Sequence, residues 1–312
     1  MSARRVSATG DPFESAGVLH LCGTYTCLLS TNSSPGHVSL GLMAGKWLSV
    51  VPTFRPPPES VELIGVLAAS SPVLVSDDAS PCSSDPTLAA IATISDVTVV
   101  RNSHNRGIGR ALNQGLAAAA SMGARWLLTV DQDSAVASTY APSIVEHADR
   151  LLAAGLRIGA VGAGDVRDAS GPLVYPTRTM SSSGEHVVVT EEVVQSGTLW
   201  SVDALQEFGG FDESLGMDAV DAAACLNLRS RGYLIALDPQ QTIAHRIENA
   251  QQVSLLGRSI MVTGHSSKRR RAMVRNRLRL FPREFRQSPL HAVRTVRRGL
   301  VNYLAVPLRK RT

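Results

Sequence analysis

The chain has 312 residues, of which 44% are hydrophobic, and its mean hydropathy is +0.05. These values are typical of a globular protein with a substantial core. No uninterrupted apolar stretch of 18 residues occurs, which argues against a membrane-spanning helix. The four cysteines form no C-x-x-C pair and no zinc-ligand pattern. We therefore expect a reduced, cytoplasmic protein.

The net charge of +5 combines two segments of opposite charge. Residues 257–312 hold 16 of the 31 Lys and Arg residues and only one of the 26 acidic residues. The remaining 256 residues hold 15 basic and 25 acidic side chains. An acidic body with a basic C-terminal segment indicates a polyanionic partner, either a nucleic acid or an anionic membrane surface.

Composition divides the chain into three parts. Residues 1–44 are rich in Ser, Thr and Gly and lack a sustained hydrophobic period, so we expect a disordered N-terminal extension. Residues 45–256 carry the strand and helix patterns of a globular domain. Residues 257–312 are predicted to form a basic, amphipathic helical tail.

From residue 47 onward, short apolar runs alternate with helix-like segments. Strands are predicted at Trp47–Val51, Val73–Ser76, Val97–Arg101 and Trp126–Val130, and helices at Glu59–Ala69, Pro86–Ile91 and Gly109–Ala120. This alternation predicts βαβ units and a parallel sheet. In such sheets, ligands bind beyond the carboxyl ends of the strands.

The second half of the globular domain is less regular. Short strands are predicted at Arg157–Val161, Leu173–Tyr175, His186–Val194 and Tyr233–Leu237, and a helix at Asp218–Ser230. We expect a nucleotide-type first half followed by a mixed half that binds the acceptor.

Two aspartates, Asp131 and Asp133, follow the fourth predicted strand. An isolated D-x-D most often satisfies the backbone groups of a loop. The alternative is a divalent-cation site, because Mg²⁺ and Mn²⁺ take oxygen ligands. Further acidic groups lie at residues 77–78 and 212–221. Because close carboxylates repel one another unless cations or donors intervene, this context favours the cation site.

Two long stretches closely resemble rhamnosyltransferase-type members of glycosyltransferase family 2. They are VVRNSHNRGIGRALNQGLAAAASMGARWLLTVDQDS and VVQSGTLWSVDALQEFGGFDESLGMDAVDAAACLNLRSRGY. VVPTFRPP and VLVSDDAS resemble the opening strands of the family, so the resemblance covers about residues 47–280. It implies an α/β GT-A fold, with a mostly parallel central sheet flanked by helices and a mixed acceptor-side half. It also implies a nucleotide-diphosphate sugar donor and an inverting transfer.

The resemblance assigns roles residue by residue. Along the nucleotide sugar it places Thr53, Asp77, Asn105, Gly107, Asn113 and Asp131, with Asp77 binding the base or ribose. Asp131 and Asp133 match the metal-binding D-x-D, and Asp133 is the expected direct ligand of Mg²⁺ or Mn²⁺. His245 stands where the family has a histidine close to the metal or diphosphate. Asp221 matches the general base, and the acceptor side is assigned to Ser196, Gly197 and Asp218.

The sequence around the expected base departs from the family pattern V-D-x-E-W-C-L-R. Ala223, Ala224 and Asn227 replace the acidic, aromatic and arginine residues. Asp221 is kept, so two functions stay open. One is a metal-dependent, inverting transfer of a sugar, L-rhamnose from dTDP-rhamnose, to a cell-envelope glycan or lipid-linked acceptor. The other is a catalytically degenerate nucleotide-sugar-binding protein that acts as a membrane-docked partner.

Apolar residues recur at helical spacing within residues 290–304, with arginines among them. A basic amphipathic helix predicts attachment to an anionic membrane, here at the inner face of the plasma membrane. The alternative is a helix that packs on the globular body and leaves a basic face in solvent. We expect no nucleic-acid partner, because no interleaved aromatic residues or known binding motif accompany the arginines.

Overall fold

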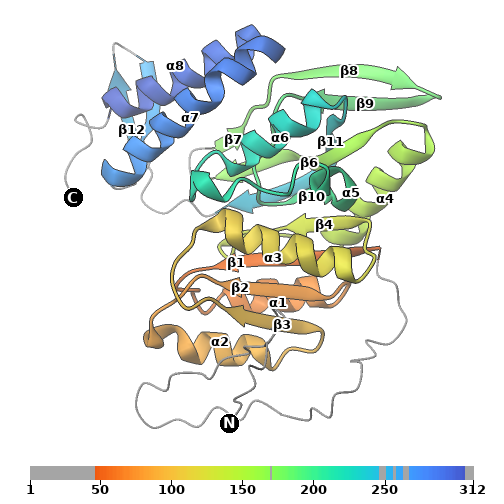
Figure 1. Ribbon diagram of the computed structural model, residues 1–312, viewed down its shortest axis with the longest axis vertical. Coiled ribbons are helices and arrows are strands. Elements are labelled where there is room, and N and C mark those ends of the chain that lie inside the picture. The colour runs from red at the N-terminus through yellow and green to blue at the C-terminus, as the bar shows by residue number, and fades with distance from the viewer. Residues whose placement is uncertain (1–45, 169–170, 246–250, 256–257, 263–266, 306–312) are drawn as a thin grey trace, which may run out of the picture. The chain divides into compact units, whose positions relative to one another are not determined.

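The computed structural model describes residues 46–168, 171–245, 251–255, 258–262 and 267–305. The predicted disordered segment 1–44 lies outside these residues. Within them, an 11-stranded sheet runs through the protein (Figure 1). Helices cover both of its faces, as expected for the predicted α/β class.

The first half of the sheet is parallel, as predicted. Strand β3 pairs with β2, β2 with β1, and β1 with β4. The elements are β1 (Trp47–Thr53), α1 (Ser60–Ala68), β2 (Val73–Asp77), η1 (Cys82–Ser84), α2 (Asp85–Ala92), β3 (Val97–Arg101), α3 (Ile108–Ser121) and β4 (Trp126–Thr129). Each predicted strand and helix of this half is present, with ends shifted by two residues at most.

The second half is mixed. Strand β10 lies antiparallel between β4 and β6, and β11 runs parallel to β6 and antiparallel to β9. The elements are β5 (Ser134–Ala135), α4 (Tyr140–Ala153), β6 (Ile158–Asp168), β7 (Gly171–Leu173), β8 (Thr177–Ser182), β9 (Glu185–Thr190), β10 (Thr198–Ser201), α5 (Val202–Gln206), η2 (Glu213–Leu215), α6 (Val220–Ser230) and β11 (Leu234–His245). Strand β11 is longer than its apolar run predicted, because its second part pairs with both β6 and β5.

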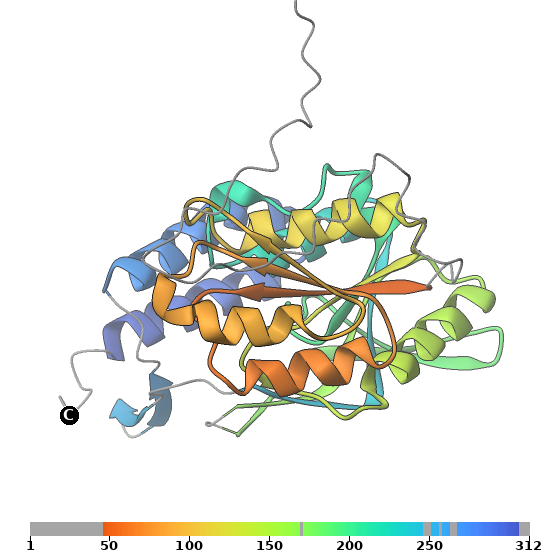
Figure 2. The same ribbon diagram turned by 90° about the horizontal axis from the view of Figure 1, so that it is seen from below.

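Each face of the sheet has its own hydrophobic core. Helices α3, α5 and α6 cover one face, and α1, α2 and α4 cover the other (Figure 2). Val50 and Val51, neighbours on β1, are both fully buried and belong to opposite cores. Their strand is therefore buried on both faces of the sheet instead of alternating between a buried and an exposed face. Trp126 and Trp200 are also fully buried and belong to opposite cores.

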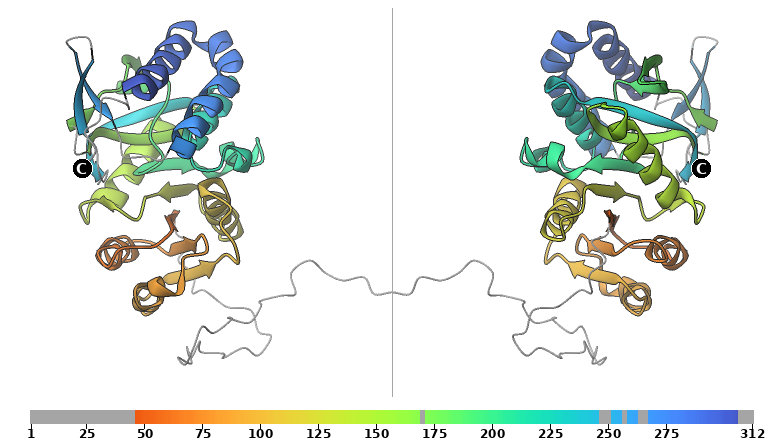
Figure 3. Two further views of the ribbon diagram at one scale, coloured as in Figure 1. Left: turned by 90° about the vertical axis from the view of Figure 1, so that its left-hand side faces the viewer. Right: turned by 90° about the vertical axis from the view of Figure 1, so that its right-hand side faces the viewer.

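After β11, the chain forms a hairpin and two long helices. Strands β12 (Gln251–Leu255) and β13 (Arg258–Val262) pair with each other, and α7 (Ser267–Gln287) is followed by α8 (Pro289–Ala305) (Figure 3). The helical character of the predicted tail is confirmed, but the boundary at residue 256 falls between two paired strands. Among the described helices, none combines the length and the apolar character needed to cross a bilayer.

Helix α3 approaches β1 closely at Gly115. A methyl group on residue 115 would lie 2.6 Å from Cβ of Val50. We expect Gly115→Ala to lower the free energy of unfolding by about 1–3 kcal/mol through overpacking. Urea denaturation measures this change. Gly65→Ala in α1 is the matched control, because nothing lies within 4 Å of a methyl group there, and it should be neutral or stabilising. A Gly115→Ala protein as stable as wild type would contradict the prediction.

Candidate functional site

The carboxyl ends of β1, β2 and β4 meet at one edge of the sheet. Thr53 pairs with Asp77 across β1 and β2, and Val50 pairs with Thr129 across β1 and β4. The parallel register therefore brings three sequence-predicted residues, Thr53, Asp77 and Asp131, to the same edge.

Asp77 is completely buried, and its carboxylate is bonded within the protein. It accepts hydrogen bonds from the backbone N–H of Ser80 at 3.1 Å and from the Ser80 hydroxyl. Arg101 forms an ion pair with it at 3.3 Å, and the Thr53 hydroxyl lies 3.4 Å away. Asp77 thus shapes the loop after β2. That Asp77 contacts a nucleotide stays a prediction. Such a contact requires one of these partners to move away from the carboxylate.

The neighbouring Asp78 holds the loop that precedes α3. Its carboxylate accepts hydrogen bonds from the backbone N–H groups of Arg106 and Gly107, both at 2.8 Å. The side-chain amide of Asn105 donates to its carbonyl at 3.3 Å. Gly107 has φ +85°, and a Cβ atom there would lie 2.8 Å from the carbonyl oxygen of Gly216. Sequence reasoning gave no role to Asp78, whose only signal was its position beside Asp77.

Asn113 ties α3 to the loop before η2. Its amide oxygen accepts from the backbone N–H of Phe211 at 2.8 Å, and its amide nitrogen donates to the Phe211 carbonyl at 3.0 Å and to Glu213 at 2.9 Å. These bonds make Asn113 a positioning residue for this loop. Its predicted place along the nucleotide stays a prediction.

Gln132, the middle residue of the D-x-D sequence, connects two loops through its side chain. The Gln132 side chain accepts from the Phe54 backbone N–H at 2.9 Å and donates to the Phe54 carbonyl at 3.0 Å. It thereby joins the loop after β4 to the loop after β1. Asp131 and Asp133 flank Gln132, and both are partly buried. Asp133 lines a groove of about 340 Å³ together with Gln132 and residues of the α1 region.

The turn at residues 195–197 supports the D-x-D from the other side. The Ser196 hydroxyl accepts a hydrogen bond from the backbone N–H of Asp131 at 2.9 Å and lies 2.7 Å from the Ser134 hydroxyl. Gly197 has φ +77° and donates its N–H to the Thr129 carbonyl at 2.8 Å. A Cβ atom on Gly197 would meet the Tyr140 hydroxyl at 2.7 Å, so this turn requires glycine. Ser196 and Gly197, predicted on the acceptor side, contact the D-x-D region directly.

His245 ends β11 next to the same region. The antiparallel pair of β11 and β5 places its backbone opposite Ser134, the residue after Asp133. The fold therefore brings the third predicted metal ligand to the D-x-D at the level of the backbone.

Asp221 lies in the first turn of α6, beside the 195–197 turn. Its carboxylate accepts a hydrogen bond from the backbone N–H of Ala222 at 2.8 Å. Burial raises the pKa of Asp221; Arg277 opposes this shift, Glu192 adds to it, and the backbone of Gln195 also lowers the pKa. The side-chain nitrogen of Gln195 is buried and has no hydrogen-bond partner in the described part of the chain. The predicted base and the predicted metal ligands thus lie beside one short turn.

Asp218 faces α7. Its carboxylate pairs with Arg269 at 3.3 Å, and its carbonyl accepts from Asn276 at 2.9 Å. Its predicted acceptor-side role stays a prediction, and these contacts give it a role in docking α7.

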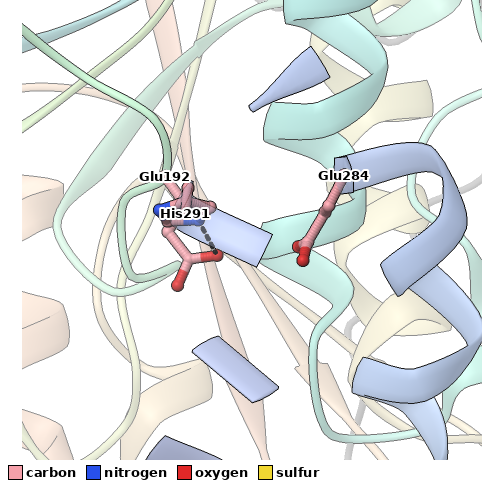
Figure 4. Close-up of side chains that lie close together, drawn as sticks. All are labelled: Glu192, Glu284 and His291. Carbon is pink, nitrogen blue, oxygen red and sulfur yellow. Dashed lines mark ion pairs between the residues drawn. The ribbon is translucent and has the colours of Figure 1, made fainter. Parts of the chain in front are cut away.

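A compact group of three titratable side chains lies where α7 and α8 meet the loop after β9 (Figure 4). It consists of Glu192, Glu284 and His291. Their ligand atoms lie within 4.8 Å of one another, as in a metal site. However, the guanidinium of Arg277 binds both oxygens of Glu192, at 2.8 and 3.1 Å, and lies 3.5 Å from Glu284. Burial alone would raise the pKa of Glu192, but Arg277 and a hydrogen bond from His291 hold it well below its usual range. Arg277 is therefore the cation of this group.

Comparison with known proteins agrees with this geometry. Residues 69–201 match the sequence model described as glycosyl transferase family 2. The matched region, residues 69–201, is similar to this family. The family resemblance noted in the motifs is thereby confirmed, and the domain is rhamnosyltransferase-like.

One relative of this family 2 domain is the dTDP-rhamnosyl transferase RfbF of Shigella flexneri. It is 29% identical over 199 residues, which are 60% of this chain and 63% of RfbF. The match thus spans less than two thirds of that relative's length.

Two solved structures resemble the domain in fold. TarS 1–349 of S. aureus, in complex with UDP-GlcNAc, has a TM-score of 0.55 at 14% identity over 83% of this chain and 72% of that chain. GalNAc-T7 with UDP, GalNAc and Mn²⁺ has a TM-score of 0.51 at 13% identity, over 76% and 47% of the respective chains. The predicted GT-A fold is confirmed.

The Ser196 hydroxyl connects the 195–197 turn to the D-x-D, which leads to a prediction. Ser196→Ala removes the acceptor of the Asp131 N–H, and loss of a hydrogen bond costs about 0.5–1.5 kcal/mol. We expect a loss of unfolding free energy in this range, measured in urea, and faster amide hydrogen exchange at Asp131. Ser121→Ala, at an exposed position, is the control and should change stability by less than about 0.5 kcal/mol. Unchanged exchange at Asp131 would contradict the role assigned to Ser196.

Proposed function

We propose that the chain is an inverting glycosyltransferase that moves a sugar from a nucleotide diphosphate to an acceptor hydroxyl. One observation carries this proposal. The turn at residues 195–197 lies between the two groups: Ser196 accepts a hydrogen bond from the N–H of Asp131 in the D-x-D, and the backbone of Gln195 lowers the pKa of Asp221. A donor-binding carboxylate pair and a separate carboxylate for the acceptor are what a single displacement requires.

The donor is proposed to be dTDP-L-rhamnose, bound over the carboxyl ends of β1 and β2. The similarity to RfbF, whose name specifies a dTDP-rhamnosyl transferase, supports this choice. Phe54 is a further candidate contact that the motifs did not single out. Its side chain is 41% exposed at the end of β1, and Gln132 fixes its backbone on both sides. An exposed, preorganised ring at this edge suits stacking against a nucleobase.

A divalent cation, Mg²⁺ or Mn²⁺, is proposed to bind at Asp131 and Asp133, with His245 beside them. The two aspartates fit such an ion, because carboxylate oxygens are the hard ligands that Mg²⁺ and Mn²⁺ prefer. When bound, the ion would stabilise the negative charge on the departing diphosphate. The GalNAc-T7 structure, with UDP and Mn²⁺, supports the same combination of ligands here.

Asp221 is proposed as the general base. In its ionised form, it would accept the proton of the attacking hydroxyl, a contribution on the order of 10²–10⁴ in rate. Attack on the face opposite the leaving diphosphate inverts the anomeric centre. The acceptor is proposed to be a cell-envelope glycan precursor, such as a lipid-linked diphosphate sugar.

Asp221→Asn separates catalysis from donor binding. We expect transfer to fall at least about 100-fold, because the proton acceptor is lost, while donor affinity stays near the wild-type value. Asp133→Asn should instead weaken metal-dependent donor binding. Calorimetry with dTDP-rhamnose and Mg²⁺ or Mn²⁺, together with a transfer assay over a panel of labelled nucleotide sugars, measures both. Donor binding without turnover or donor hydrolysis in the wild type would favour the catalytically degenerate alternative.

The outer face of α8 is proposed to dock on an anionic membrane surface, close to a lipid-linked acceptor. Exposed apolar side chains on this helix are Leu290 (74% exposed), Val293 (50%) and Leu300 (45%). Arg294 and Arg297, also exposed, lie among them. Apolar side chains with interspersed arginines suit the interface of an anionic bilayer. The charge count of residues 257–312 indicated a larger basic surface. Three of its arginines instead bind the globular body, namely Arg269, Arg277 and Arg283.

Sedimentation with vesicles tests this surface. We expect Leu290→Ser/Val293→Ser to reduce binding to phosphatidylglycerol vesicles at least about tenfold, because two apolar side chains no longer leave water. Wild-type binding should also weaken as salt rises, since screening shortens the attraction between arginines and lipid. Val174→Ser, at a residue 75% exposed on another part of the domain, is the matched control. Equal binding of wild type and the double variant would remove the membrane proposal.

A further inference from the structure

We propose that Arg277 of α7 is a positioning residue for Asp221, so that the C-terminal helices form part of the catalytic unit. The inference rests on the proposed role of Asp221 as the base. It gives α7 a function apart from the membrane contact assigned to α8.

The ion pair of Arg277 holds the segment 191–192 in place. The guanidinium forms two parallel hydrogen bonds to Glu192, a geometry that fixes orientation as well as distance. Glu284, two helical turns further along α7, lies 3.5 Å from the same guanidinium and is only 3% exposed. His291 of α8 lies 3.5 Å from Glu192 (Figure 4). A second bond, from the Ser288 hydroxyl to Glu191 at 2.9 Å, fastens the same segment to the junction of α7 and α8.

From Glu192, the chain leads directly to the predicted site. The backbone of Gln195, three residues later, lowers the pKa of Asp221, and Ser196 binds the Asp131 N–H. Gly197 is fixed to the end of β4. The segment 191–197 is therefore held by helices at one end and by the sheet at the other, and Asp221 lies beside it. Loss of the Arg277 pair would weaken the first end, where Glu191 would keep its bonds to Ser288 and Arg229.

Arg277 also acts on Asp221 through its charge. The charged and titratable groups around Asp221 are Arg277 from α7, Glu192 from the loop, Tyr175, and Cys225 from α6. Arg277 is the cation among them, and it opposes the effect of burial on the pKa of Asp221. Removing this charge raises the pKa further. Because a base works only when ionised, the acid limb of the rate profile should then move to higher pH.

The experiment compares three variants of the full chain. Arg277→Gln removes the charge and the paired bonds, and Arg277→Lys keeps the charge but not the fork. Arg275→Gln, at an exposed position on the same helix, is the control for charge and helix position. Each is assayed for transfer from dTDP-rhamnose between pH 5 and pH 9, and for hydrogen exchange of residues 191–197 and 220–225. Circular dichroism and thermal melting verify folding.

For Arg277→Gln, we expect about a 100-fold lower kcat, an acid limb at higher pH and faster exchange of residues 191–197, with donor KM near wild type. Arg277→Lys should keep the wild-type limb with an intermediate kcat, and Arg275→Gln should match wild type throughout. If Arg277→Gln does not fold, Arg277→Lys decides the matter by exchange and kcat. Wild-type exchange and kcat in the folded Arg277 variants would overturn the positioning role. A wild-type protein inactive with every donor would overturn the proposed function, and exchange would still test Arg277.

Discussion

Carboxylates gathered at one edge of a sheet must each be matched by a donor or a cation, and the architecture of the site follows from this constraint. Asp77 is matched by Arg101 and the Ser80 loop, and Asp78 by the backbone N–H groups before α3. Glu192 is matched by Arg277. In each case the compensation comes from a segment that the pairing also fixes in place. The loops around the site are thus ordered by charge compensation before any ligand binds.

The carboxylates are not all compensated to the same degree. This difference distinguishes Glu192, which has a structural role, from Asp221, which is proposed for catalysis. Asp221 accepts a hydrogen bond from the backbone N–H of Ala222, while the guanidinium of Arg277 is bonded to Glu192. Burial therefore keeps the pKa of Asp221 above its ordinary value, whereas the pKa of Glu192 is held low. A carboxylate that holds a proton more readily is suited to take one from a hydroxyl. Glu192, whose pKa is held low by Arg277, is suited only to an ion pair.

The sequence predicted those parts of the fold that depend on local pattern. The strands β1 to β4 and their helices were predictable because apolar runs and turn residues lie within each segment. The insertion of β10 between β4 and β6 was not, because strand order depends on pairing between distant segments. The D-x-D and Asp221 were recognisable from motifs. Asp78, Gln132 and Arg277 were not, since their roles depend on partners 28, 78 and 85 residues away.

The departures around Asp221 become understandable once α7 is included. Ala223 and Ala224 replace an acidic and an aromatic residue of the family pattern, and both are buried in the cluster that also contains Leu280 of α7. At Asn227, where the pattern has arginine, the side chain accepts a hydrogen bond from Arg283 of α7. Helix α6 thus has small residues where α7 packs against it, and α7 supplies arginines at this contact. The charge next to Asp221 comes from residues 192 and 277 instead of from α6 itself. Asp221 therefore has charged neighbours that come from outside α6.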